Sequence, residues 1–230
     1  MTPFGSIARV DPALRTSRGY NADFGWRGTV RDMLKFDIGA FYLSYRDRVG
    51  LRTVDDVGGA FTETTNIGHS VHRGVEMYLE FDPLALDRES TSSRRLDLFT
   101  SFAYIDARYV SGEFRGNRVE QAPRILNRTG VTYALGRFGT TLQASYTAAS
   151  YGDANNSRTP TDDAEAGLVP AYTVWDWSGA LRIVSRYRLS LGVNNLTDRR
   201  YFTKRTGEYP GPGILPGIGR SFYAGIRATF

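Results

Sequence analysis

Apolar and polar residues alternate along several long stretches of the chain, and no other feature of the sequence constrains the fold as strongly. Between residues 74 and 82, every second side chain is apolar and the intervening ones are mostly charged. The same alternation recurs in residues 20–30, 140–151, 172–183, 189–194 and 222–230. Because successive side chains of a β-strand point to opposite faces, each stretch predicts a strand with one apolar and one polar face.

The number and length of these strands point to a membrane. Three further segments, residues 35–48, 96–109 and 121–135, are expected to be strands as well. The total is about nine strands of roughly 9 to 16 residues, whereas strands of globular sheets usually have about five or six. A tilted strand needs about 9 to 11 residues to cross a bilayer. The sequence therefore favours a transmembrane sheet over a soluble one.

The predicted connections alternate between short and long. Short turns are expected at residues 31–34, 136–137 and 185–186, with one of moderate length at 83–95. Long connections rich in Gly, Pro, Asn, Asp and Arg are expected at residues 47–74 (partly strand), 110–120, 152–170 and 203–219. Short periplasmic turns and long extracellular loops are typical of outer-membrane β-barrels. The fold class is therefore predicted as all-β, a transmembrane antiparallel up-and-down β-barrel.

The predicted strand count is odd, which bears on how the barrel closes. With Phe230 at the periplasmic side, counting back along the strands makes residues 1–17 the tail of an extracellular loop. Bacterial single-chain barrels have an even number of strands. We therefore expect residues 1–230 to be the C-terminal part of a larger barrel.

Composition narrows the range of functions. The chain has no cysteine and two histidines, which excludes thiolate chemistry, disulfides and most His-based catalytic schemes. Of its 29 basic residues, all but Lys35 and Lys204 are Arg, and they are spread without the cluster that nucleic acid binding needs. No enzyme activity, cofactor, metal or nucleic acid partner is expected. Two alternatives to a transporter stay open: a porin or translocator barrel without a plug, and a soluble β-rich binding domain.

Five segments, taken in order along the chain, resemble a known family. They are residues 19–28 (GYNADFGWRG), 37–45 (DIGAFYLSY), 66–77 (NIGHSVHRGVEM), 191–202 (LGVNNLTDRRYF) and 220–230 (RSFYAGIRATF). This ordered set resembles the C-terminal part of the barrel of TonB-dependent outer-membrane transporters. Within that family, residues 101–108, 151–157 and 168–175 resemble the transporters of the ferric dicitrate type.

The resemblance implies a protein larger than this chain. It implies a barrel of about 22 strands, with an N-terminal plug domain and a TonB box that lie outside residues 1–230. It further implies TonB-dependent uptake of a ferric chelate, of the ferric citrate or siderophore type, across the outer membrane of a Gram-negative bacterium. The implied partners are the chelate, outer-membrane lipid and lipopolysaccharide, and, only through the absent N-terminal part, the TonB complex.

Basic residues near the predicted long loops are the candidate ligand-binding residues. Ferric citrate and ferric siderophores are anionic, and Arg recognises carboxylates through two parallel hydrogen bonds. Arg48 and Arg52 lie where a predicted strand meets a long loop, and Arg158, Lys204 and Arg205 lie at comparable heights. The alternative is a general surface charge that meets lipopolysaccharide phosphates.

Aromatic residues on the apolar faces have predicted structural roles. Tyr20, Trp175 and Trp177 lie near the outer ends of their strands and are expected in the aromatic belt at the membrane interface. Phe222 begins the apolar file of the last strand, and Phe230 ends it at the C-terminus. These two are the predicted signal for insertion into the outer membrane.

The remaining polar motifs are expected to be structural. The box at residues 194–198 is expected to fix a bend, and His69 and His72 to lie on a strand or loop surface. Residues 162–165 are expected to be a solvated loop rather than a Ca²⁺ site. Charged residues of the polar faces are expected to line the barrel lumen, as a wet wall or as contacts to a plug: Arg27, Glu76, Glu80, Asp82, Asp176 and Arg182.

Overall fold

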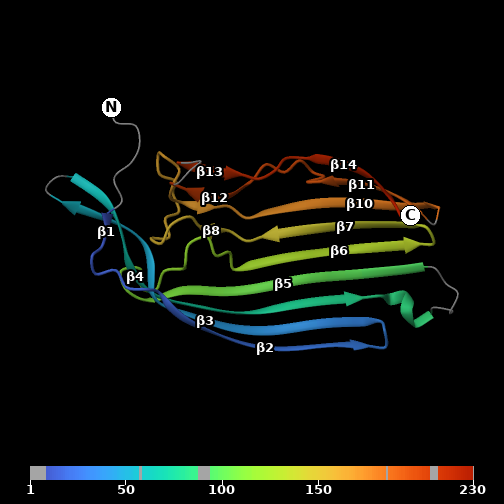
Figure 1. Ribbon diagram of the computed structural model, residues 1–230, viewed down its shortest axis with the longest axis horizontal. Helices are drawn as coiled ribbons and strands as arrows, with labels where there is room; N and C mark the ends of the chain where they lie inside the picture. The colour runs from blue at the N-terminus through green and yellow to red at the C-terminus, as the bar shows by residue number, and fades with distance from the viewer. Residues whose placement is uncertain (1–8, 57–58, 88–93, 185, 208–211, 230) are drawn as a thin grey trace.

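The chain folds into one broad sheet. The structure is a computed structural model of residues 1–230, and it describes residues 9–56, 59–87, 94–184, 186–207 and 212–229. Among these, the main sheet has ten strands, and all but β1 follow the order β2–β3–β4–β5–β6–β7–β10–β11–β14. Every neighbouring pair on this path is antiparallel. The sheet therefore has the up-and-down topology that the sequence predicts (Figure 1).

All the predicted strands are present, although some are longer or shorter than expected. The elements are β1 (Arg9–Val10), β2 (Arg18–Val30), β3 (Leu34–Asp56), β4 (Gly59–Phe81), η1 (Pro83–Asp87), β5 (Arg94–Ser111), β6 (Ile125–Leu135), β7 (Phe138–Thr147), β8 (Ser150–Tyr151), β9 (Leu168–Val169), β10 (Tyr172–Val184), β11 (Tyr187–Asn194), β12 (Phe202–Thr206), β13 (Gly213–Pro216) and β14 (Ser221–Ala228). The ladder between β3 and β4 continues as far as the pair Asp56 and Gly59, so residues 47–74 form mostly a hairpin rather than a loop. The expected loop at residues 203–219 likewise contains the short hairpin β12–β13.

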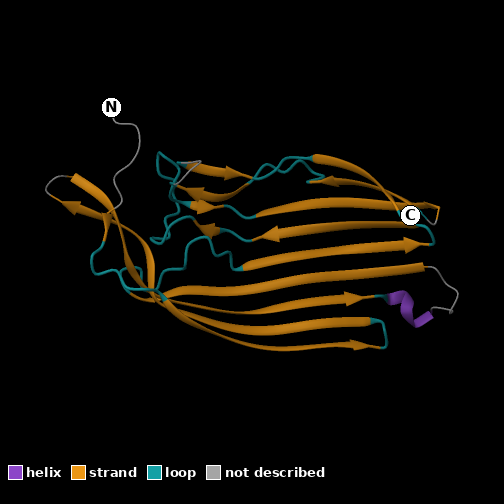
Figure 2. Ribbon diagram, in the orientation of Figure 1, coloured by secondary structure: helices purple, strands orange, loops and turns teal. Residues whose placement is uncertain are grey.

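The connections differ at the two ends of the sheet. The turns after β2, β6 and β10 are short, and they lie at the same end as the helix η1; we call this the short-turn end (Figure 2). Arg31 and Asp32, in the first of these turns, have φ angles of 48° and 51°, which is the left-handed conformation of a tight hairpin. The connections 112–124, 148–171 and 195–220 lie at the opposite, long-loop end. The predicted alternation of short and long connections is thus present.

One face of the sheet is apolar and exposed. Phe24, Trp26, Phe222 and Ile226 on this face are 78%, 67%, 73% and 75% exposed. Rows of apolar side chains this wide are rarely left facing water, and they fit a face turned to lipid. The opposite face carries the alternate, mostly polar residues of each strand.

The apolar band has about the height of a membrane core. On the apolar face, the band runs from the pair Leu34 and Phe81 to the pair Tyr42 and Arg73. It ends there because Arg73 is charged and forms a 3.2 Å ion pair with Asp106. The step from Leu34 to Tyr42 is eight residues (42 − 34), which is about 27 Å along a strand. A strand tilt of about 40° reduces this to roughly 21 Å, close to the band of about 25 Å in outer-membrane barrels.

Glycines on the polar face lie beneath aromatic rings of the neighbouring strand. Gly130 is directly opposite Phe99, and Gly192 is directly opposite Tyr223. A Cβ atom would lie 2.5 Å from the Phe99 ring at the first position and 2.3 Å from the Tyr223 ring at the second. Because no real Cβ approaches this closely, only glycine lets these rings cover the backbone and tie adjacent strands together.

A small core lies at the long-loop end. Ile67, Ala107, Tyr109, Phe114 and Val119 are buried together. They come from β4, β5 and the connection after β5, so this connection packs onto the strands rather than extending into solvent. None of the described residues forms a helix long and apolar enough to span a membrane.

Candidate functional site

The loops at the long-loop end pack against one another. We call this assembly the loop layer: residues 112–124, 148–171 and 195–220, with the outer part of the β3–β4 hairpin. Asn156 exchanges hydrogen bonds of 2.7 and 2.8 Å with the backbone of Arg118, which joins the first two loops. Arg205 donates to the carbonyl oxygens of Ala164 and Leu168 at 2.9 and 3.1 Å, which joins the second and third. The loop layer is therefore one connected structure.

Arg48 holds the hairpin to the first loop. Its guanidinium donates a 2.6 Å hydrogen bond to one oxygen of Glu120, and the Tyr109 hydroxyl donates to the other oxygen at 2.8 Å. The guanidinium carbon also lies 5.5 Å from the centre of the Tyr109 ring. Tyr109 is only 1% exposed, and burial, assisted by the bond to Glu120, raises the pKa of its hydroxyl. The three side chains form a clamp between β3, β5 and the loop at residues 112–124.

The other predicted ligand residues have different surroundings. Arg205 is 6% exposed, and its guanidinium lies 5.0 Å from the Phe202 ring, so it serves the contact between loops. Arg158 is exposed and Lys204 is half-buried. Arg52 is paired with Glu63 in the β3–β4 ladder, and its side chain lies outside the described ones. Ligand binding by any of these residues stays a prediction, and among their described side chains Arg158 is the exposed arginine.

A polar hollow at the base of the hairpin was not anticipated from the sequence. It has a volume of about 360 Å³ and is lined by Arg15, Arg46, Asp47, Asn66, Gly68, His69, Ser111 and Gly112. The Asn66 side chain accepts a 2.8 Å hydrogen bond from the Arg15 amide and donates to the carbonyl oxygens of Arg15 and Asp47 at 2.8 and 2.7 Å. Asn66 is the first residue of the segment 66–77, which resembles the family, and this resemblance is the one feature of the sequence that indicated this region. One of its two arginines, Arg15, forms a 3.6 Å ion pair with the Asp47 carboxylate, and Arg46 is the second cation of the hollow.

The box at residues 194–198 fixes a bend, as predicted. Asn195 is 2% exposed, and its side-chain amide donates to the carbonyl oxygens of Arg199 and Ile218 while accepting from the Arg199 amide at 2.8 Å. Asp198 accepts a 3.1 Å hydrogen bond from the Arg220 amide. Both Asn195 and Asp198 have positive φ angles, of 51° and 53°. These contacts join the two ends of the third loop.

The predicted interface aromatics lie on the apolar face. Tyr20 stacks on Tyr42, with ring centres 5.8 Å apart, at the level where charged residues first appear on this face. Trp175 is 40% exposed, and the Trp177 indole donates a 3.0 Å hydrogen bond to the Thr140 hydroxyl. Their place in a membrane interface stays a prediction.

Phe222 points outward from the last strand and is largely exposed, as a lipid-facing or assembly residue must be. Phe230 lies outside the described residues. The role of both residues in assembly stays a prediction.

The polar motifs give no metal site within the described residues. His69 Nε2 lies 2.8 Å from the Ser44 hydroxyl, and His72 Nε2 lies 3.4 Å from the Ser70 hydroxyl. In this part of the chain, no group of three or more His, Cys, Asp or Glu side chains is placed to hold a metal ion. Asp163 instead accepts hydrogen bonds within its own loop, which lowers the pKa of its carboxyl.

Comparison with solved structures finds the same fold in several transporters and receptors. The chain superposes on the ferric citrate transporter FecA in its unliganded form with a TM-score of 0.73 at 22% identity, covering 92% of this chain and 31% of that one. The copper transporter OprC gives 0.71 at 19%, covering 96% and 33%, and the ferric yersiniabactin receptor FyuA of Yersinia pestis gives 0.69 at 20%, covering 93% and 30%. The chain thus spans about a third of the length of these proteins.

Sequence comparison gives the family directly. No curated protein matches the chain. The family model described as TonB dependent receptor-like, beta-barrel, matches residues 1–196, which includes every strand from β1 to β11. The chain therefore belongs to the family of TonB-dependent receptor-like β-barrels.

Proposed function

We propose that residues 1–230 form the C-terminal segment of the barrel of an outer-membrane transporter that imports an anionic ferric chelate. Members of this family are outer-membrane β-barrels of Gram-negative bacteria, and they are transporters and receptors rather than enzymes. The observation that carries the proposal is the two-faced sheet whose long-loop end bears an arginine-rich loop layer. In this proposal the apolar face contacts outer-membrane lipid, the long-loop end faces the medium and the short-turn end faces the periplasm.

The cargo is proposed from charge. Solved relatives include transporters named for ferric citrate, copper and ferric yersiniabactin, so the shared fold does not define one substrate. Arg158 in the loop layer is exposed, and Arg46 lines the polar hollow beside Arg15, which is paired with Asp47. Permanently charged guanidinium groups at these places favour a carboxylate-bearing chelate such as ferric citrate or a carboxylate siderophore.

The remaining partners are proposed from the family. A plug domain and the TonB contact would be supplied by polypeptide outside residues 1–230, because the matched proteins are about three times as long. Exposed arginines at the outer rim are available to lipopolysaccharide phosphates. The chain itself is proposed to supply barrel wall and loops.

Uptake by cells that produce the protein tests the proposal. We expect deletion of the gene to abolish import of one ferric chelate in a panel containing ferric citrate and ferric siderophores. Arg158→Gln and Arg46→Gln should each raise the half-saturating concentration by about tenfold, as expected for losing one hydrogen bond to a charged group. Arg186→Gln, an exposed arginine at the short-turn end, is the matched control and should leave uptake unchanged. Equal import of every chelate without the gene would contradict the function, whereas unchanged Arg158 and Arg46 variants would contradict only the assigned ligand residues.

A further inference from the structure

Three arginines form a row across the last three strands of the sheet. Arg182 in β10 is directly opposite Arg188 in β11, which is directly opposite Arg227 in β14. All three are exposed and lie at the short-turn end. They share the polar face, because Leu181 and Ile226 beside them belong to the apolar one. Cross-strand neighbours have Cβ atoms about 5 Å apart, so like charges in this arrangement destabilise a sheet.

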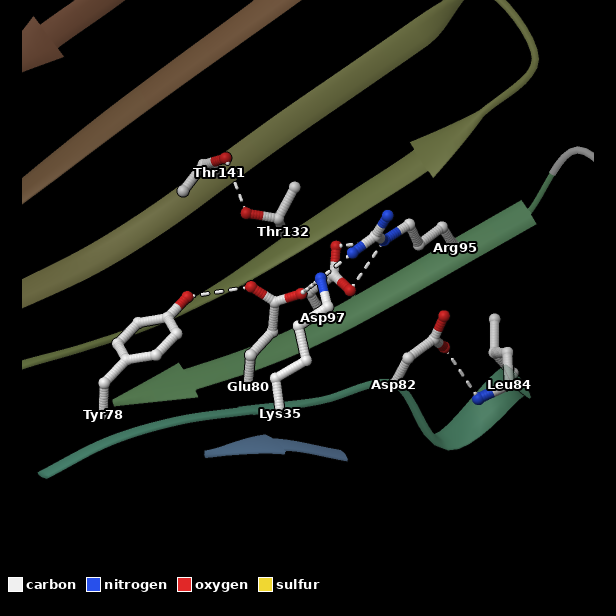
Figure 3. A network of polar contacts seen from close by, with 9 residues as sticks. All are labelled: Lys35, Tyr78, Glu80, Asp82, Leu84, Arg95, Asp97, Thr132 and Thr141. Carbon is white, nitrogen blue, oxygen red and sulfur yellow. Dashed lines mark hydrogen bonds and ion pairs between the residues drawn. The ribbon is translucent and has the colours of Figure 1, made fainter. Parts of the chain in front are cut away.

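The row lacks the compensation that other charges on the same face have. Toward the N-terminal side, Lys35 and Arg95 both contact Glu80 at 2.9 Å, and Arg95 also pairs with Asp97 at 2.7 Å (Figure 3). The Tyr78 hydroxyl completes that network with a 2.8 Å hydrogen bond to Glu80 (Figure 3). The sheet therefore balances cations with carboxylates across β3, β4 and β5.

Among the residues that the structure describes, no such carboxylate accompanies the arginine row. Within the described part of the chain, Arg182, Arg188 and Arg227 have no ion pair. The acidic residue of the same face on these three strands is Asp176, six positions from Arg182 (182 − 176), and its oxygens accept from the Asn195 amide and the Gln143 side chain. Among the described residues, these three permanent charges therefore stand together without a paired anion.

A hollow lies beside two of the three arginines. It has a volume of about 410 Å³ and is lined by Arg188, Ser190, Gly225, Ile226 and Arg227. The next rank of the polar face consists of Ala180, Ser190 and Gly225, which are small. In the following rank, the Tyr223 ring covers Gly192. The small residues therefore lie between the arginines on one side and the Tyr223 ring on the other, and Ser190 contributes a hydroxyl group there. Guanidinium groups around such a floor recognise carboxylates through paired hydrogen bonds.

We propose that Arg182, Arg188 and Arg227 form a carboxylate-binding site, and that its occupant is an acidic segment of polypeptide held against the polar face of the sheet. Repulsion within the row exists at all times, so a resident segment offsets it better than a passing solute. A tethered segment also reaches a high effective concentration. The site rests on the proposed barrel, whose interior the polar face would line, but not on the identity of the transported chelate.

Peptide binding by the 230-residue chain in detergent micelles tests the site. The probe is a fluorescent peptide of alternating Glu and Ser, titrated at constant ionic strength, with far-ultraviolet circular dichroism confirming the sheet in each variant. We expect saturable binding that weakens by about tenfold or more in the double variant Arg188→Gln, Arg227→Gln, because two charge-assisted contacts are lost. The matched control is Arg95→Gln. The Arg95 side chain is already paired with Glu80 and Asp97, so this substitution should leave the peptide affinity unchanged. Equal affinity of the double variant and the unaltered chain would overturn the site.

Two further measurements separate the remaining outcomes. Without peptide, Arg188→Gln should raise the thermal midpoint by relieving repulsion, whereas Arg95→Gln should lower it by breaking a network; a lowered midpoint for Arg188→Gln would overturn the argument from repulsion. Citrate carries the same carboxylate groups on a small molecule. If citrate displaces the peptide when the citrate carboxylates are less concentrated than the peptide carboxylates, the proposal of a polypeptide occupant is overturned. Neither measurement involves uptake, so failure here and failure of the transport proposal remain distinguishable.

Discussion

Arg48 and Glu120, 72 residues apart in sequence, form a 2.6 Å hydrogen-bonded ion pair that fastens the first long loop to the β3–β4 hairpin. Their side chains are 26% and 22% exposed, so the pair is partly withdrawn from solvent. The Tyr109 hydroxyl takes the second Glu120 oxygen, which fixes the carboxylate from two sides. Arg48, which the sequence suggests as a ligand-binding residue, thus holds the first long loop in place.

Removing the carboxylate should loosen this loop. Glu120→Gln leaves Arg48 without its charge partner and weakens the bond from Tyr109, at an expected cost of about 1–3 kcal/mol. The measurement is the rate of tryptic cleavage at exposed Arg115 in the same loop, together with the thermal midpoint. Arg73→Gln is the control, since its ion pair is 67% exposed on the Arg73 side and is expected to contribute about 0–1 kcal/mol. Cleavage no faster in Glu120→Gln than in Arg73→Gln would show that the clamp does not hold the loop.

The same cluster should make the loop layer sensitive to alkali. Tyr109 lies beyond the apolar band, and burial raises the pKa of its hydroxyl above the ordinary value of about 10. Above that pH the unfolded chain loses this proton while the folded chain keeps it, so the free energy of unfolding falls as pH rises through this range. Below pH of about 10 the contribution is fully present. The difference in midpoint between the unaltered chain and Tyr109→Phe should therefore shrink from pH 9 to 11.5, and a constant difference would contradict the assignment.

Strand periodicity predicts this fold well, because every second residue of a strand lies on the same face of the sheet and the two faces differ in polarity. The pairs Trp26 with Ile38 and Leu79 with Phe36 lie on the predicted apolar face, and each predicted strand finds its neighbour. The extension of β3 and β4 beyond the membrane band could not be read in the same way. In residues 48–68 the alternation fades, because this part of the hairpin extends beyond the ladder between β4 and β5, which begins at His69.

The site is less predictable because loops are held by contacts far apart in sequence. The position of Arg205 near a loop suggested an exposed cation, yet it is buried against carbonyl oxygens 37 and 41 residues away. The arginine row depends on register: positions 182, 188 and 227 carry no common motif, and only the pairing of β10, β11 and β14 brings them together.

A glycine of the polar face that is covered by an aromatic ring should tolerate substitution less well than a glycine without such a ring. Gly130→Ala would place a Cβ 2.5 Å from the Phe99 ring and 2.7 Å from the Leu142 carbonyl oxygen, so either ring or strand must move. We expect a loss of about 1–3 kcal/mol, as for other overpacked positions. Gly139→Ala is the control, since the nearest atom to its Cβ would be 4.0 Å away. Thermal unfolding in micelles measures both, and equal midpoints would mean that the Phe99 ring gives way freely.

Phe222 should act in assembly rather than in ligand binding. It is 73% exposed on the apolar face at the start of β14, directly opposite Val193. Phe222→Ser puts a polar group on a lipid-facing position and should lower the amount of protein in the outer membrane without changing the affinity for chelate of the fraction that inserts. Quantified membrane fractions and whole-cell binding provide the two readouts. Normal insertion combined with weaker binding would reverse this assignment.

The orientation of the sheet is testable with two single cysteines, because the chain has none of its own. Asn155 lies in the loop layer and Arg186 in a short turn, and both are exposed, so each cysteine is reachable by solvent from its own side of the membrane. A membrane-impermeant maleimide added to intact cells should label Asn155→Cys and spare Arg186→Cys, and permeabilised cells should label both. The physical reason is that short turns of outer-membrane barrels face the periplasm while the long loops face the medium. Labelling of Arg186→Cys alone in intact cells would invert the sheet, and it would move the arginine row to the outer surface and the polar hollow at Arg46 to the periplasm.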